Sequence, residues 1–387
     1  MNIRTFKKIL PAIIASSCFT LGNGFFMPFM SLRLKLENFS TDFIGFITSV
    51  FFLGLFLGSF FVNKIIERKG ICKAYFLFIT MDISCLLLQA YSFNIYLWII
   101  LRLLEGICIS GFIISIESWL LLNSNLKNKG KILSYYKFLT YLFLGISQFF
   151  LNVGDIRTNI HFFITASCVA ISFIPIFLFR KSSPKILKKS NIKFSEFLKT
   201  SPMGILAGFI AGCTLGSIYG LLPIFAKNQN MSIFEISKVM RLALFGSLLF
   251  QLPIGFLSDR FNRKKILFIT SLINILVCFI FLQKQIPQAL FFPSILIFGG
   301  FSFIIYPLSM SISSDSSGET NQVKSASVIM TMYALGAIIG PLIASFLMQH
   351  ISSKMLFYYF ASLNLLLATS YLIFANKSKR IDVTINP

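Results

Sequence analysis

The stretch that decides the fold runs from Gly58 to Lys73 and reads GSFFVNKIIERKGICK. A second stretch, from Phe250 to Lys265, reads FQLPIGFLSDRFNRKK and has the same plan: an apolar run, an acidic-basic pair and further basic residues. The spacing that relates Glu67-Arg68 to Asp259-Arg260 also relates Ser40 to Ser232, Ile44 to Ile236, Gly54 to Gly246, Lys73 to Lys265 and Tyr141 to Tyr333. A long segment of the chain is therefore duplicated, and the acidic-basic pair follows an apolar run in both copies.

The composition places these apolar runs in a membrane. The 387 residues are 56% hydrophobic and only 12% charged, with a mean hydropathy of +0.81. A helix that crosses a bilayer needs about 20 apolar residues. Twelve segments meet this need, at roughly 10–32, 43–66, 74–92, 95–122, 132–153, 160–180, 202–226, 237–257, 266–283, 287–313, 325–349 and 354–375. The sequence predicts an all-α polytopic membrane protein with twelve transmembrane helices in two six-helix bundles, and it disfavours a soluble enzyme with buried helices.

The formal net charge of +22 has a topological explanation. Most Lys and Arg residues fall in the loops that share one side of the membrane with both termini. Because positive charge stays on the cytoplasmic side, we expect both termini in the cytoplasm of a bacterial inner-membrane protein, and no nucleic-acid partner. The seven cysteines are scattered without a C-x-x-C pair, so no disulfide, metal site or cofactor is expected.

The longest polar stretch, RKSSPKILKKSNIKFSEFLKT, runs from Arg180 to Thr200. It divides the chain into an N-terminal bundle (1–180), a basic cytoplasmic linker (181–200) and a C-terminal bundle (201–387). Six spans separate the two copies, and an even number restores the orientation. Parallel repeats of this kind are a recurrent transporter design.

Three motifs carry a family resemblance. Gly255 to Lys264 reads GFLSDRFNRK and resembles the G-x-L-x-D-R-x-G-R-R/K signature of the major facilitator superfamily, with Asn262 in place of a glycine. Asn can also adopt the left-handed turn geometry that glycine supplies. Arg102-Leu-Leu-Glu105-Gly106 is similar to the family's R-x-x-Q-G motif, and Gly336 to Pro341 resembles its glycine-proline motif. The resemblance implies the twelve-helix carrier fold and secondary transport.

A narrower resemblance is to the YcaD-type branch of bacterial inner-membrane carriers. It rests on Glu117-Ser118, Gly216-Ser-Ile-Tyr219-Gly220-Leu-Leu-Pro223, Pro253-Ile-Gly255 and Tyr306-Pro307. This branch brings no firm substrate class with it.

The resemblance gives the acidic-basic loops a conformational role. In the superfamily they latch the cytoplasmic side of the two bundles. The residues expected to do so here are Glu67, Arg68, Asp259, Arg260 and Arg263. The simpler interpretation is that these basic residues only set topology. The first copy is the more degraded one, with Asn63 and Glu67 where the signature has Gly and Asp.

Charged residues inside spans mark function or a buried pair. Asp82 in the third span and Glu105 in the fourth lie at similar depth, and Arg102 shares a helix face with Glu105. The three are candidates for proton coupling, because a partner cation favours the charged carboxylate and apolar burial the neutral one. A static ion-pair network is the alternative.

Glu117 is a fourth proton-coupling candidate, level with Lys137 across a predicted helical hairpin, where the two could pair. Arg241, near the end of the eighth span, is expected to reach the membrane interface. Attraction of an anionic substrate is the alternative role for Arg241.

Polar residues at span centres are candidates for the lining of a substrate cavity: Asn23, Gln148, Tyr219, Gln251, Tyr306 and Tyr333. Pro28, Pro223, Pro253, Pro307 and Pro341 are expected to bend or break their helices. Helix packing is the alternative role for both sets.

No nucleotide-binding G-x-x-x-x-G-K-[ST] run or H-E-x-x-H metal motif is present, so we expect no enzyme. The sequence favours a monomeric secondary carrier that moves a small organic solute, most simply with protons. A non-transporting sensor on a carrier scaffold and an efflux antiporter remain alternatives. The glycine-proline motif of antiporters belongs to the fifth span, whereas here it lies in the eleventh.

Overall fold

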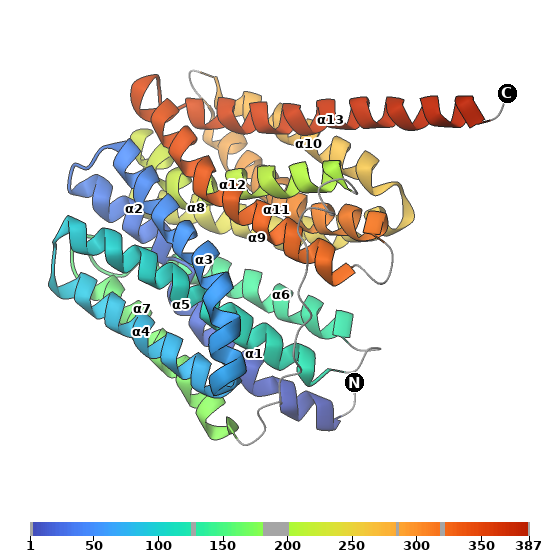
Figure 1. Ribbon diagram of the computed structural model, residues 1–387. Coiled ribbons are helices and arrows are strands. Elements are labelled where there is room, and N and C mark those ends of the chain that lie inside the picture. Colours follow the sequence, from blue (N-terminus) through green and yellow to red (C-terminus); the bar gives the residue numbers. More distant parts are fainter. Residues whose placement is uncertain (1–2, 125–128, 181–200, 284–285, 318–321, 386–387) are drawn as a thin grey trace. The chain divides into compact units, whose positions relative to one another are not determined.

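The computed structural model describes residues 3–124, 129–180, 201–283, 286–317 and 322–385. The predicted linker at 181–200 lies outside these residues. Within them the chain is helical (Figure 1), in the order α1 (Ile3–Asn23), α2 (Phe26–Leu36), α3 (Thr41–Lys69), α4 (Ile71–Tyr91), α5 (Ile95–Leu122), α6 (Lys129–Ser147), the 3-10 helix η1 (Gln148–Asn152), α7 (Ile160–Leu178), α8 (Pro202–Asn228), α9 (Ile233–Arg260), α10 (Arg263–Phe281), α11 (Gln288–Ser317), α12 (Gln322–His350) and α13 (Met355–Ile385).

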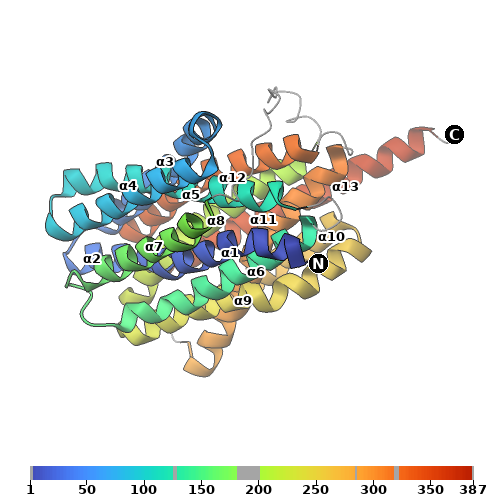
Figure 2. The same ribbon diagram turned by 90° about the horizontal axis from the view of Figure 1, so that it is seen from below.

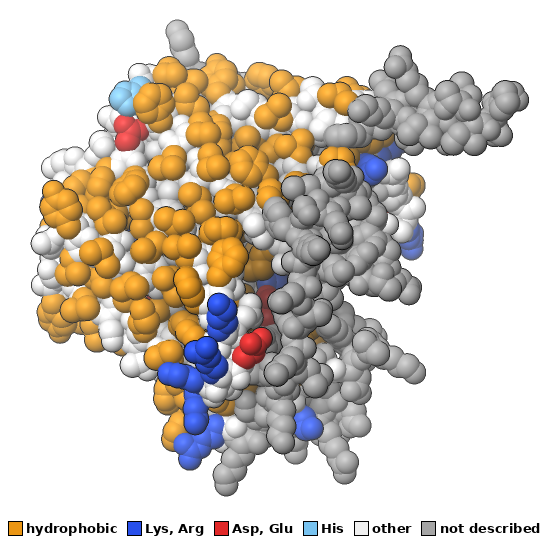
Figure 3. Space-filling model, viewed as in Figure 1, with side chains coloured by type: hydrophobic (Ala, Val, Ile, Leu, Met, Phe, Trp, Pro, Cys, Tyr) orange, Lys and Arg blue, Asp and Glu red, His pale blue; other side chains and the backbone are white. Residues whose placement is uncertain are grey.

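Eleven spans in the described part of the chain are long and apolar enough to cross a membrane. The first of them, Lys8–Leu36, combines α1 and α2. Helix α6 stands in the place of the fifth predicted span and is less apolar, with Lys129, Lys131 and Lys137 along it. Hydrophobic side chains cover much of the left-hand and upper part of the face drawn in Figure 3, as suits a surface in contact with lipid. The prediction of an all-α polytopic protein is confirmed.

Residue contacts divide the chain into two compact units. Unit 1 comprises Met1–Ser190 and Gln229–Arg241, and unit 2 comprises Asn191–Asn228 and Leu242–Pro387. In unit 1, α3 packs on α5, α1 on α7, and α4 on both α5 and α7. Helices α4 and α5 run side by side in both ribbon views (Figures 1 and 2). In unit 2, α8 packs on α12, and α10 on α11 and α13.

The duplication is visible in how the helices cross. A Cβ atom added to Gly54 of α3 would collide with the backbone carbonyl of Leu103 in α5, and Gly106 of α5 faces Gly54. In the second copy, Gly246 of α9 lies equally close to the carbonyl of Leu296 in α11. Glycine permits this close approach of helix backbones in a membrane. The two copies therefore share a packing device as well as a sequence pattern.

Pro28 explains why the first predicted span is two helices. Proline has no N–H, so the carbonyl four residues earlier, that of Gly24, loses its intrahelical donor. The side chain of Gln148 replaces it, with Nε2 donating to the Gly24 oxygen at 2.9 Å. The other predicted helix breakers, Pro223, Pro253, Pro307 and Pro341, lie inside helices that continue past them.

Candidate functional site

A buried charged cluster connects α4 and α5. Arg102 and Glu105 are one helical turn apart, and Nη1 of Arg102 lies 2.6 Å from Oε2 of Glu105. Gln89, from the end of α4, donates through Nε2 to the other Glu105 oxygen at 2.7 Å. The Arg102 guanidinium also lies over the ring of Phe51, with its Cζ 4.7 Å from the ring centre. Two donors thus hold the Glu105 carboxylate, and an aromatic face covers its arginine partner.

Asp82 belongs to the same region but differs in its bonding. It is 1% exposed, and neither carboxylate oxygen has a hydrogen-bond partner among the described residues. The structure therefore brings together three of the four proton-coupling candidates, and only Arg102 and Glu105 are in direct contact. Asp82 is a buried acid with no donor to stabilise its charged form.

The fourth candidate, Glu117, lies apart from this cluster and forms the predicted pair with Lys137. Nζ of Lys137 lies 2.9 Å from Oε1 of Glu117, between α5 and α6. Both side chains are partly exposed, so this pair is more accessible than the pair formed by Arg102 and Glu105.

The six cavity candidates fall into different surroundings. Gln148 is fully buried and supports the break between α1 and α2. In unit 2, the rings of Tyr306 and Tyr333 have centroids 4.8 Å apart, and the ring of Tyr219 lies 5.8 Å from that of Phe303. The five candidates other than Gln148 are half-buried: Asn23, Tyr219, Gln251, Tyr306 and Tyr333. Unit 2 holds four of the six candidates, namely Tyr219, Gln251, Tyr306 and Tyr333, and the rings of Tyr306 and Tyr333 are in contact.

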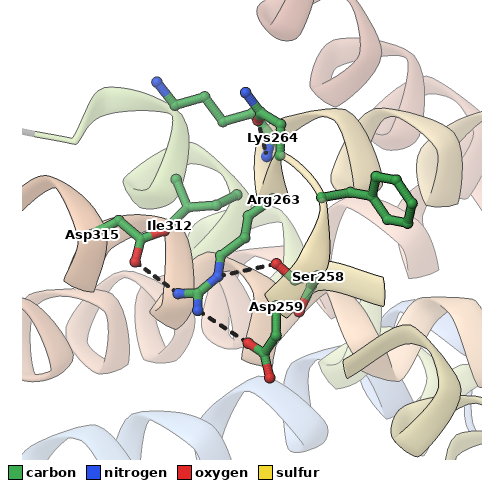
Figure 4. A pocket seen from close by; sticks show the side chains of 8 residues that line it. Ser258, Asp259, Arg263, Lys264, Ile312 and Asp315 are labelled. Atoms are coloured by element: carbon green, nitrogen blue, oxygen red, sulfur yellow. Dashed lines mark hydrogen bonds and ion pairs between the residues drawn. The ribbon is translucent and has the colours of Figure 1, made fainter. Parts of the chain in front are cut away.

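The second acidic-basic loop is a small ionic network at the junction of α9 and α10 (Figure 4). Arg263 places Nη2 3.1 Å from Oδ1 of Asp259 and Nη1 2.8 Å from Oδ1 of Asp315. Its Nη1 also donates to the backbone carbonyl of Ser311 in α11. Asp259, Arg263 and Asp315 line an open pocket of about 430 Å³. Asp315 was not predicted, because it lies far along the chain and only the packing of α11 brings it to the loop.

The first copy has no such network. Glu67 and Arg68 are exposed and make no ion pair with another described residue. The position that corresponds to Arg263 is Ile71, which is 1% exposed. Near the position that corresponds to Asp315 the chain has Leu122 and Asn123, and neither is acidic. The asymmetry between the copies therefore extends to the partners of the arginine.

The two loops also turn by different means. Gly70 adopts a φ of 82°, a conformation that favours glycine, between α3 and α4. The corresponding residue, Asn262, has a φ of −58°, so the expectation of left-handed geometry is wrong. Its side chain instead caps α10, with Oδ1 accepting from the backbone N–H groups of Lys264 and Lys265. In the second loop, a side-chain cap of α10 by Asn262 therefore takes the place of the positive backbone φ that Gly70 supplies in the first loop.

The expected position of Arg241 at the membrane interface is also wrong. Its side chain is only 7% exposed and lies over Phe149 of η1, with Cζ 4.0 Å from the ring centre. Its Nη1 donates to Oγ of Ser237 at 2.8 Å, and that hydroxyl donates to the Gln148 carbonyl at 2.6 Å. Arg241 fastens the first turns of α9 to η1 within unit 1.

These features define a class of protein: a multi-pass helical membrane protein built from a duplicated helical unit, with ionisable groups buried inside its spans. No group of three or more His, Cys, Asp and Glu side chains in the described residues could hold a metal ion. The sequence model of the Major Facilitator Superfamily matches residues 12–244 and 204–384. The chain belongs to this superfamily of transporters.

Curated relatives agree with the narrower resemblance. The chain is 25% identical over 336 residues to the uncharacterized MFS-type transporter YcaD of Escherichia fergusonii, covering 86% of this chain and 87% of the relative. It is also 25% identical over 367 residues to YcaD of Salmonella typhi, covering 94% of each. The resemblance to YcaD-like carriers is confirmed over nearly the whole chain.

Solved structures share the fold at low identity. A mutant of the nucleoside transporter NupG has a TM-score of 0.82 and 14% identity, covering 94% of this chain and 99% of that one. A D-xylose-proton symporter has a TM-score of 0.77 and 14% identity, covering 96% and 97%. These likenesses confirm the carrier fold.

Proposed function

We propose that this chain is a proton-coupled secondary transporter that moves a small organic solute across the bacterial inner membrane by alternating access. Both termini face the cytoplasm, and the monomer is the working unit. The observation that carries the proposal is the set of ionisable side chains buried between α4 and α5. Such groups are costly inside a membrane, and in carriers they mark ion pathways.

The roles of the other residues follow from their places in the two units. Arg263, with Asp259 and Asp315, supports a conformational latch in the second copy. The exposed residues Glu67 and Arg68 in the first copy are a weaker counterpart, because they form no ion pair with any residue that the structure describes. The half-buried tyrosines of unit 2 support a cavity lining in which aromatic faces and hydroxyls meet the solute.

Uptake into proteoliposomes tests the proposal. The purified chain is reconstituted and offered labelled uridine, D-xylose, a dipeptide and an organic anion, each with and without an imposed pH gradient. These probes match four transporters whose structures share the fold: a nucleoside transporter, a D-xylose-proton symporter, a peptide transporter and an organic anion transporter. We expect accumulation of at least one solute that requires the gradient. Accumulation that ignores the gradient would remove the proton coupling, and no flux across a broad panel would favour a sensor.

A further inference from the structure

Asp82 stands out among the buried acids because no described residue donates a hydrogen bond to its carboxyl group. Its two oxygens are buried, and neither accepts a hydrogen bond from a described residue. Glu105 in the same region receives one bond from Arg102 and one from Gln89. Two carboxyl groups at the same depth therefore have opposite environments.

The charges of Arg102 and Glu105 determine whether Asp82 is ionised or protonated. Arg102 and Glu105 form a pair at 2.6 Å whose charges cancel. An ionised Asp82 would add a negative charge that no cation is left to balance, in a site closed to water. An isolated charge in such a place is strongly disfavoured, and a buried acid without a partner takes up a proton instead.

Among the described residues, the groups that face Asp82 include no cation besides Arg102. Helix α5 contributes Arg102, Glu105 and Cys108, and α4 contributes Cys85 one turn away. The charged residues of α3 lie towards its two ends, at Asp42 and from Lys64 to Lys69. Helix α7 has two titratable residues, His161 in its first turn and Cys168, whose Cβ lies against Gly22 of α1.

We infer that Asp82 carries the coupling proton and that Arg102 and Glu105 form the fixed charged pair beside it. This inference rests on the proposed function and assigns separate roles to residues that the sequence groups together. On one side of the membrane the Asp82 carboxylate takes a proton from hydronium, forming its O–H bond and leaving water. On the other side that O–H bond breaks, and the proton forms a new O–H bond with a water molecule, which leaves as hydronium.

The position of Asp82 suits this role. It lies nine residues from the end of α4, about 14 Å from the turn between α4 and α5, near the middle of the span. In the present conformation Asp82 is closed to water. A residue that carries a proton across a membrane must pass through such a closed state between the conformations that expose it to either side. Movement of α4 against α5 would open Asp82 to water without breaking the pair formed by Arg102 and Glu105, because both members of that pair lie on α5.

Infrared difference spectroscopy on the full chain in lipid vesicles tests the assignment with the proton itself as the probe. At neutral pH we expect a carboxylic acid C=O band in the native protein. In D₂O this band should shift in the fraction of molecules whose carboxyl proton has exchanged for deuterium. The band should be lost in Asp82→Asn and in Asp82→Ser. It should be retained in the double variant Arg102→Met/Glu105→Gln, which removes the other buried acid together with its cation. Absence of the band from the native protein, or its survival in a folded Asp82 variant, would overturn the inference.

Uptake in the same vesicles separates this inference from the proposed function. Asp82→Asn should lose gradient-driven accumulation of whichever panel solute the native protein concentrates, while it keeps solute exchange. If the native protein concentrates no solute, the proposed function fails, and the infrared band still decides which carboxyl group is protonated. If the native protein is coupled and Asp82→Asn accumulates solute equally well, only the assignment to Asp82 fails.

Discussion

Replacing Glu105 by glutamine should be among the most damaging single changes in the described chain. The substitution keeps the size of the side chain but leaves the Arg102 guanidinium, which is fully buried, without a counter-charge. Removing one partner of a buried ion pair costs about 3–5 kcal/mol, because the remaining charge is uncompensated. The free energy of unfolding, measured by titration with a denaturing detergent, should therefore fall by this amount.

A matched control uses the same substitution at a partly exposed pair. Glu37 lies at the end of α2 and pairs with Arg33 at 3.2 Å, with 32% of the Glu37 side chain and 12% of the Arg33 side chain exposed. Ion pairs that reach solvent contribute about 0–1 kcal/mol, so Glu37→Gln should cost less stability than Glu105→Gln. The double variant Arg102→Met/Glu105→Gln removes the orphaned charge and should recover about 1–3 kcal/mol relative to Glu105→Gln.

The reasoning fails if Glu105→Gln is no more destabilising than Glu37→Gln. It also fails if the second substitution at Arg102 adds to the loss instead of offsetting it. Either result would mean that Arg102 does not depend on Glu105 for its charge balance.

Three further predictions concern packing and the loops. Gly246→Ala should lower the free energy of unfolding by about 1–3 kcal/mol, because the added methyl group would collide with the carbonyl of Leu296. The control is Gly255→Ala in the same helix. A methyl group at Gly255 meets open space, so this variant should be neutral or stabilising in the same unfolding assay. Gln148→Ala should lower the free energy of unfolding by about 1–3 kcal/mol, because the Gly24 carbonyl loses its hydrogen-bond donor. The same substitution should lower it less in a Pro28→Ala background, where residue 28 has a backbone N–H that can donate to Gly24. Asp315→Asn should slow uptake of the panel solutes and change the free energy of unfolding by less than about 1 kcal/mol, because its partner Arg263 is partly exposed. Glu67→Gln in the first copy should slow uptake less than Asp315→Asn does. A larger effect of Glu67→Gln would contradict the assignment of the stronger latch to the second copy.

The helical membrane fold was predictable because its cause is local. A run of about 20 apolar residues crosses a bilayer whatever its neighbours are, and the repeated spacing of Glu67 and Asp259 reports the duplication directly. The pairing of Glu117 with Lys137 was predictable for a related reason. Two residues equally far from the loop that joins two antiparallel helices lie level with each other, and the structure places Nζ of Lys137 2.9 Å from Oε1 of Glu117.

The contacts that the sequence did not predict involve residues that only helix packing brings together. Arg241 is buried because η1 supplies Phe149 and, through the Gln148 carbonyl, an anchor for Ser237, and these contacts join residues far apart in sequence. Asp315 likewise reaches Arg263 only because α11 packs beside the loop that joins α9 and α10. Neither contact has a periodic signal in the chain, so sequence patterns could not predict it.

The acidic-basic stretch at Gly58 and its copy at Phe250 determined by themselves that the protein is a duplicated, polytopic membrane protein, because hydropathy and repeat spacing are properties of the chain alone. The tertiary structure decided which charges are balanced. Among the described residues, two donors bind Glu105 and none binds Asp82. Arg263 has two acidic partners, whereas Glu67 and Arg68 form no ion pair within the same part of the chain. The physical reason is that the cost of a buried charge depends on the atoms within a few ångströms of it, and helix packing selects those atoms.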